Sequence, residues 1–108
     1  MSGYVLSGDA DTDLQDIFLF GYSALGEKQA TTYLHELYET LDRIGANPGI
    51  GRVRPDLHPL VRAFPRRSHT VFFLPWRGGT LITRILHGAA DHQKAFDGFD
   101  PLASVQSD

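Results

Sequence analysis

The sequence SHTVFFLPWRGGTLITRILHGAAD, residues 68–91, contains two apolar runs on either side of Arg77-Gly78-Gly79. Residues 69–76 and 80–87 are rich in the β-branched and aromatic side chains that favour strands. Glycine tolerates the positive φ angles that tight hairpin turns require. The stretch therefore predicts an antiparallel β-hairpin.

Both faces of this hairpin carry apolar side chains. Side chains alternate between the two faces of a strand. In the second strand this alternation places Leu81, Thr83, Ile85 and His87 on one face, and Ile82, Arg84 and Leu86 on the other. One face must cover the rest of the core. The other face would leave a large apolar surface, so we expect it to bind a partner.

Two amphipathic helices are predicted before the hairpin. Ser7 is a suitable N-cap, and acidic residues follow it where a helix N-terminus favours negative charge. Gly26 is a C-cap or hinge between the helices. The apolar stripe of the second helix consists of Ala30, Tyr33, Leu34, Leu37, Tyr38, Leu41 and Ile44. The short connection predicts that the helices form an antiparallel hairpin.

The other segments are assigned from their apolar runs and turn residues. They are a short strand at 4–7, a loop at 50–58, a strand at 60–64, a turn at 65–67 and one helical turn at 91–96. Residues 1–96 then form a single α+β domain: a short N-terminal strand, an antiparallel helix hairpin and an antiparallel β-sheet, in the order β-α-α-β-β-β. Residues 97–108 are expected to form a flexible C-terminal tail.

Composition excludes several kinds of site. The 108 residues contain no cysteine, and the five histidines form no recognisable ligand pair, so we expect no metal and no cofactor. No apolar run is long enough to span a bilayer, and the N-terminus lacks a signal-peptide pattern. We therefore expect a cytoplasmic protein without a membrane partner. The net charge of −3 argues against strong direct binding of nucleic acid, although arginines crowd the middle of the chain.

Several short motifs occur in a defined order along the chain. They are Leu6-Ser7, Asp13-Leu14-x-x-Ile17, Gly26-Glu27-x-x-Ala30, Asn47-Pro48-Gly49-x-Gly51 and Arg84-Ile85-Leu86-His87-Gly88. Their order and spacing, from Tyr4 to Phe96, resemble the ParE branch of the RelE/ParE toxin superfamily. The resemblance implies the toxin component of a type II toxin–antitoxin pair.

The resemblance implies an inhibitor rather than an enzyme, one that traps DNA gyrase on cleaved DNA and so blocks replication. It also implies a ParD-like antitoxin whose disordered C-terminal arm folds on the toxin. Large side chains suited to anchoring this arm are Phe18, Tyr22, Tyr33, Leu37 and Trp76. The residues expected to contact the target are Arg62, Arg84 and His87. For the two arginines, the alternative is an ion pair at a sheet margin.

A RelE-like, ribosome-dependent messenger-RNA endonuclease is the alternative within the same superfamily. The positions that carry catalysis in that branch fall here on Ala90, Phe96 and Thr70, none of which can do the same chemistry. If the chain cuts RNA, His87 is the remaining acid–base group, with Arg62 and Arg84 as phosphate contacts. A third alternative is a relative that binds the antitoxin without being toxic.

Overall fold

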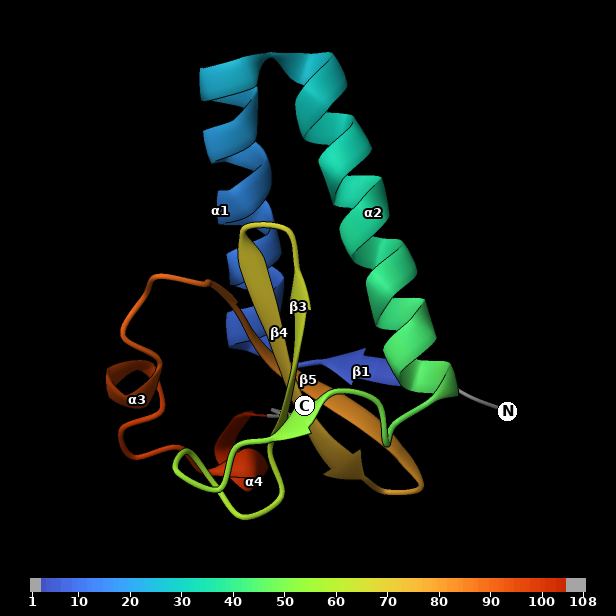
Figure 1. Ribbon diagram of the computed structural model, residues 1–108, viewed down its shortest axis with the longest axis vertical. Helices are drawn as coiled ribbons and strands as arrows, with labels where there is room; N and C mark the ends of the chain where they lie inside the picture. The colour runs from blue at the N-terminus through green and yellow to red at the C-terminus, as the bar shows by residue number, and fades with distance from the viewer. Residues whose placement is uncertain (1–2, 105–108) are drawn as a thin grey trace.

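The computed structural model describes residues 3–104, which form a five-stranded sheet with a helix hairpin packed on one face (Figure 1). The strand order is β1-β5-β4-β3-β2. The elements are β1 (Tyr4–Leu6), α1 (Gly8–Leu25), α2 (Glu27–Ala46), β2 (Arg52–Val53), β3 (Arg62–Arg66), β4 (His69–Trp76), β5 (Gly79–His87), α3 (His92–Ala95) and α4 (Pro101–Ser104). The predicted α+β order of strand, helix hairpin and sheet is confirmed.

The sheet differs from the prediction at both edges. It is mixed rather than wholly antiparallel, because β1 pairs in parallel with β5. At the other edge, β2 forms within the predicted loop 50–58. β3 begins later than predicted, because the Val61 N–H still donates to the His58 carbonyl oxygen. It continues through Pro65, whose missing N–H is tolerated because β2 pairs only with earlier residues of β3.

Ser7 and Gly26 set the ends of α1. The Ser7 Oγ accepts a hydrogen bond from the Ala10 N–H at 2.9 Å and donates one to the Thr83 carbonyl oxygen at 2.7 Å. The predicted N-cap is confirmed, and the same hydroxyl attaches α1 to β5. Gly26 alone separates the two helices and has a φ of +93°, as expected for a hinge. Among the described residues, no helix is both long and apolar enough to cross a membrane.

A β-bulge interrupts the alternation predicted for β5. The pairing between β4 and β5 shifts at Phe72/Phe73, and Thr83 is the extra residue. Its hydroxyl donates to the Phe72 carbonyl oxygen at 3.1 Å. The predicted face shared by Leu81 and Ile85 is therefore wrong. The bulge places Ile85 beneath the helices and Leu81 on the opposite face of the sheet.

The sheet face opposite the helices is covered by the chain itself. Its buried cluster consists of Val61, Ala63, Phe72, Leu74, Leu81 and Phe96. The covering segments are the β2–β3 loop and the C-terminal segment, and Asp56 links them by accepting hydrogen bonds from Arg54 and Gln93. The prediction that this face binds a partner is wrong, because these side chains form a second core.

The C-terminal segment continues past the predicted domain boundary. The predicted helical turn is α3, which Asp91 caps by accepting a hydrogen bond from the Lys94 N–H at 3.0 Å. Phe99 packs against Phe96 with ring centroids 5.1 Å apart, and α4 follows. The flexible tail over residues 97–108 stays a prediction, and residues 105–108 lie outside the described part of the chain.

Gly51 is required where the chain enters β2. Its φ is +84°, and a Cβ there would lie 2.5 Å from the Ala63 carbonyl oxygen. Gly51→Ala should lower the free energy of unfolding by about 2 kcal/mol, because it adds left-handed strain and displaces β3. Gly49→Ala is the matched control, since its added Cβ would meet nothing within 4 Å. Urea unfolding measures both variants, and equal stabilities would contradict this role of Gly51.

Candidate functional site

A cavity of about 850 Å³ lies between the helix hairpin and the β3–β4 turn. The ends of α1 and α2 that meet at Gly26 extend beyond this turn, so the sheet does not back them there (Figure 1). We call this cavity the hairpin groove. Its apolar wall contains Ile17, Phe20, Gly21, Leu25 and Ala30. Its polar part contains Lys28, Tyr33, Glu36, Arg67, His69 and His87.

The apolar wall of the hairpin groove is open to solvent. Phe20 is 76% exposed and Leu25 is 62% exposed, and Tyr22 on the same helix is 51% exposed. Covering such side chains is favourable by about 25 cal/mol per Å² of apolar area. Large apolar side chains that a fold leaves uncovered side by side are typical of a protein-binding surface.

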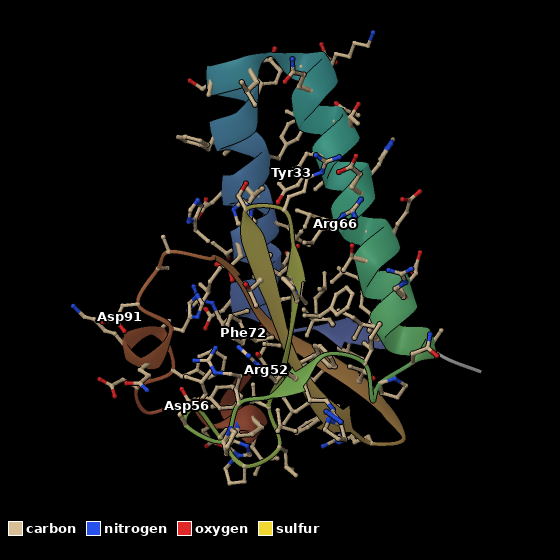
Figure 2. The ribbon with its side chains drawn as sticks, viewed as in Figure 1. Tyr33, Arg52, Asp56, Arg66, Phe72 and Asp91 are labelled. Carbon is tan, nitrogen blue, oxygen red and sulfur yellow. The ribbon has the colours of Figure 1, made fainter. Side chains whose placement is uncertain are left out.

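Two histidines meet at the polar end of the groove. His69 begins β4 and His87 ends β5, and they form the last cross-strand pair of that ladder. Their ring centroids are 5.5 Å apart in an edge-to-face arrangement. The Tyr33 hydroxyl lies 2.7 Å from His69 Nδ1 and 3.1 Å from the Arg66 carbonyl oxygen. Figure 2 shows Tyr33 on α2 near Arg66, the last residue of β3.

Glu36 connects α2 to the β3–β4 turn. Its carboxylate accepts hydrogen bonds from Arg67 at 2.6 and 3.1 Å and lies 3.4 Å from the Arg66 guanidinium. The hydrogen bond from Arg67 is the main cause that lowers the pKa of Glu36. Because two arginines share one carboxylate, this cluster is locally positive in a chain whose net charge is −3.

The predicted antitoxin contacts occupy four different settings. Tyr33 lines the hairpin groove, and Phe18 and Tyr22 form a ring pair on α1 with centroids 6.0 Å apart. Leu37 is fully buried in the core beneath the helices, so the prediction that it is a surface contact is wrong. Trp76 ends β4, at the end of the strand remote from the groove, and packs against the second core.

Arg84, a predicted target contact, is bound by Asp13 of α1. The Arg84 guanidinium donates two hydrogen bonds to the Asp13 carboxylate, at 2.8 and 3.0 Å. These hydrogen bonds are the main cause that raises the pKa of Arg84. The two side chains are 25% and 12% exposed. Of the two alternatives for this arginine, the ion pair at the sheet margin is the one observed.

The residues predicted for an RNA-cutting site do not form one cluster. Arg62 of β3 pairs with Phe73 of β4, whereas His87 of β5 pairs with His69, which is four residues away along β4. That offset is about 13 Å along the strand, and β3 and β5 are not neighbours. Phe96, at the position of a tyrosine in the nuclease branch, is 5% exposed within the second core. Within residues 3–104, no three metal-ligating side chains are grouped to hold an ion.

Sequence reasoning did not select Phe20 or Leu25 as partner contacts. The signal was present, because residues 17–20 are four consecutive large apolar side chains on one helix. A surface helix needs only one apolar stripe, so apolar residues beyond that stripe must be exposed or covered by a partner. The buried side of α1 uses Ala10 and Leu14, with Ile17 partly buried.

Comparison with known proteins identifies the family. The family model of the ParE toxin of the type II toxin–antitoxin system, parDE, matches residues 4–92. The chain belongs to the ParE toxin family. It is 38% identical over 91 residues to Toxin ParE1 of Mycobacterium tuberculosis, covering 83% of this chain and 93% of that protein. It is 36% identical over 89 residues to Toxin ParE1 of Caulobacter vibrioides, covering 81% of this chain and 90% of that protein. It is 30% identical over 92 residues to Toxin ParE of Escherichia coli, covering 84% and 89%.

A solved structure has the same fold as this ParE family member. It is a chain of the chromosomal ParDE TA system from P. aeruginosa, with a TM-score of 0.69 and 21% sequence identity. The alignment covers 81% of this chain and 96% of that chain. The predicted ParE-like fold is thus confirmed. The family match ends at residue 92, so most of α3 and all of α4 lie beyond it.

Proposed function

We propose that this ParE family member inhibits DNA gyrase and thereby blocks replication, as an inhibitor rather than an enzyme. The observation that carries the proposal is the ParE toxin match over residues 4–92. The spatial separation of Arg62 from His87, together with the pairing of Arg84 with Asp13, argues against an RNA-cutting site made of the three predicted residues. A gyrase target would place the toxin in the bacterial cytoplasm.

Two assays run side by side test this proposal. Purified toxin is added to supercoiling by DNA gyrase, and separately to translation of a reporter message whose cleavage is mapped. Loss of supercoiling with intact message is the expected result. Cleavage of the message at the ribosome with normal supercoiling would contradict it and would favour the endonuclease. No effect in either assay would favour a non-toxic relative that only binds its antitoxin. Arg62 and His87 remain our proposed target contacts, whereas Arg84 is left out because Asp13 binds its guanidinium.

We further propose that a ParD-like antitoxin places its C-terminal arm in the hairpin groove. The exposed Phe20 and Leu25, beside Tyr22, support this docking site. An arm that is disordered before binding loses conformational entropy when it folds, so it needs a large apolar area to bury. Trp76 remains a proposed second contact for the part of the arm that leaves the groove.

Phe20→Ala should weaken binding of the ParD-like antitoxin by at least about tenfold, because a large exposed ring in a cavity wall is suited to anchor a partner. Leu19→Ala is the matched control. Leu19 is 63% exposed on the same helix but does not line the cavity. Isothermal titration calorimetry of both variants measures the effect. Equal affinities for the two variants would remove the groove from the antitoxin interface.

A further inference from the structure

We propose that the antitoxin arm places an acidic side chain on the His69–His87 pair, so that the toxin takes up a proton on binding and the complex tightens as the pH falls. This inference rests on the docking site proposed above and adds a chemical requirement to it. It follows from the hydrogen bonds that the Nδ1 atoms of His69 and His87 already make within the chain.

The hydrogen bonds of Tyr33 assign the proton of neutral His69. The Tyr33 hydroxyl has one hydrogen, yet it contacts both the Arg66 carbonyl oxygen and His69 Nδ1. A carbonyl oxygen can only accept. Both contacts are satisfied when Tyr33 donates to Arg66 and His69 Nδ1–H donates to the Tyr33 oxygen. Neutral His69 then carries its proton on Nδ1 and has a lone pair on Nε2.

His87 has the opposite tautomer. Its Nδ1 accepts a hydrogen bond from the Ala89 N–H at 3.1 Å, so the proton of the neutral ring lies on Nε2. The Nε2–H of His87 is therefore a hydrogen-bond donor. His69 can gain a proton at its free Nε2 and keep its bond to Tyr33.

A carboxylate matches the protonated pair and not the neutral one. Carboxylate oxygens accept only, so the lone pair on His69 Nε2 repels them until a proton occupies it. With that proton, each of the two rings carries an Nε2–H donor, and His69 carries a positive charge. A charge-assisted hydrogen bond of this kind is stronger than one between neutral groups.

The surrounding charges favour an acidic ligand. The cations are Lys28 on α2 and Arg66 and Arg67 at the β3–β4 turn; the acids are Asp13 and Asp16 on α1 and Glu36 on α2. Asp13 is paired with Arg84, and Glu36 is shared by two arginines. The remaining charges are Lys28, one arginine and Asp16, so the groove is positive by one unit before His69 is protonated. An acidic arm therefore meets a local charge opposite to its own.

The sign of the pH dependence follows from His69. Burial lowers its pKa, His87 lowers it further, and Asp13 partly opposes these effects. Free His69 is therefore neutral near pH 7. A bound carboxylate favours the protonated form and raises this pKa in the complex. Protons are taken up at pH values between the free and the bound pKa of His69. As the pH rises through that window, the affinity for the antitoxin falls by at most about tenfold per pH unit for one proton.

Isothermal titration calorimetry measures how many protons the complex takes up on binding. The full-length toxin is titrated with purified ParD-like antitoxin between pH 6 and 7.5 (about the range of free histidine), in buffers of different ionisation enthalpy. The slope of the binding enthalpy against buffer enthalpy gives the number of protons taken up. His69→Gln and His87→Gln are the matched variants. Circular dichroism checks that both variants are folded, and a measurable affinity for the antitoxin checks that the apolar wall still binds.

Uptake of close to one proton by the wild type is the expected result. The uptake should vanish in His69→Gln and persist in His87→Gln, whose side-chain amide can still donate a hydrogen bond. Tight binding with no proton uptake would overturn the inference and leave the docking site in place. Uptake that survives in His69→Gln would also overturn it. No heat of binding at all would overturn the docking site itself.

Discussion

Phe72→Ala should lower the free energy of unfolding by about 3–5 kcal/mol, because it removes a large, fully buried ring. Phe72 is fully buried at the centre of the second core. Its ring contacts those of Phe96 and His92, with centroids 5.3 and 5.0 Å away, and the Arg54 guanidinium lies over it at 5.9 Å. Figure 2 shows Phe72 on β4, on the side where α3 and the loop that carries Asp56 lie.

The loss of stability in Phe72→Ala should be measured by urea unfolding, with Phe20→Ala as the control. Both variants remove the same ring, but Phe20 is 76% exposed, so its loss should change stability by less than about 0.5 kcal/mol. Small domains have only about 5–15 kcal/mol of stability, so Phe72→Ala should also increase protease cleavage of the C-terminal segment. A stability loss no greater than that of Phe20→Ala would show that the segment beyond β5 does not cover the sheet.

The sequence predicted the elements better than it predicted the faces of the sheet. Helix caps such as Ser7 and hinges such as Gly26 act through neighbouring residues, so a local pattern is sufficient to find them. The bulge at Thr83 depends instead on how two strands pair, which no single strand encodes. One extra residue moves every later side chain to the other face. For this reason, the predicted grouping of residues on β5 was wrong.

The same bulge explains why the histidine pair was not predicted. Counting outward from the Arg77-Gly78 turn without a bulge pairs His69 with Leu86. The extra residue at Thr83 places His69 opposite His87 instead. The second core was also beyond sequence reasoning, because Phe96 and Phe99 follow β5 in the chain but pack beside Phe72 or its neighbours only after the chain turns back.

Asp13→Ala should lower the free energy of unfolding by about 2–3 kcal/mol. Removing one partner of a buried ion pair costs about 3–5 kcal/mol, and the 25% exposure of Arg84 reduces that value through solvent screening. Asp13 has a second role, because its Oδ2 also accepts the Ile85 N–H at 2.8 Å. This N–H lies on β5 beyond the residues that pair with β1, so Asp13 completes the hydrogen bonding of an otherwise open strand edge.

Asp13→Asn separates the two roles of this side chain. The amide oxygen can still accept the Ile85 N–H, whereas the charge opposite Arg84 is lost, so the cost should fall to about 1–2 kcal/mol. The double variant Asp13→Ala with Arg84→Met should be less destabilised than the sum of the single variants, because no unpaired charge remains. Urea unfolding of the full cycle measures the coupling. Additive losses would show that Arg84 is not dependent on Asp13, and Arg84 would then return to the residues considered for contact with the toxin's target.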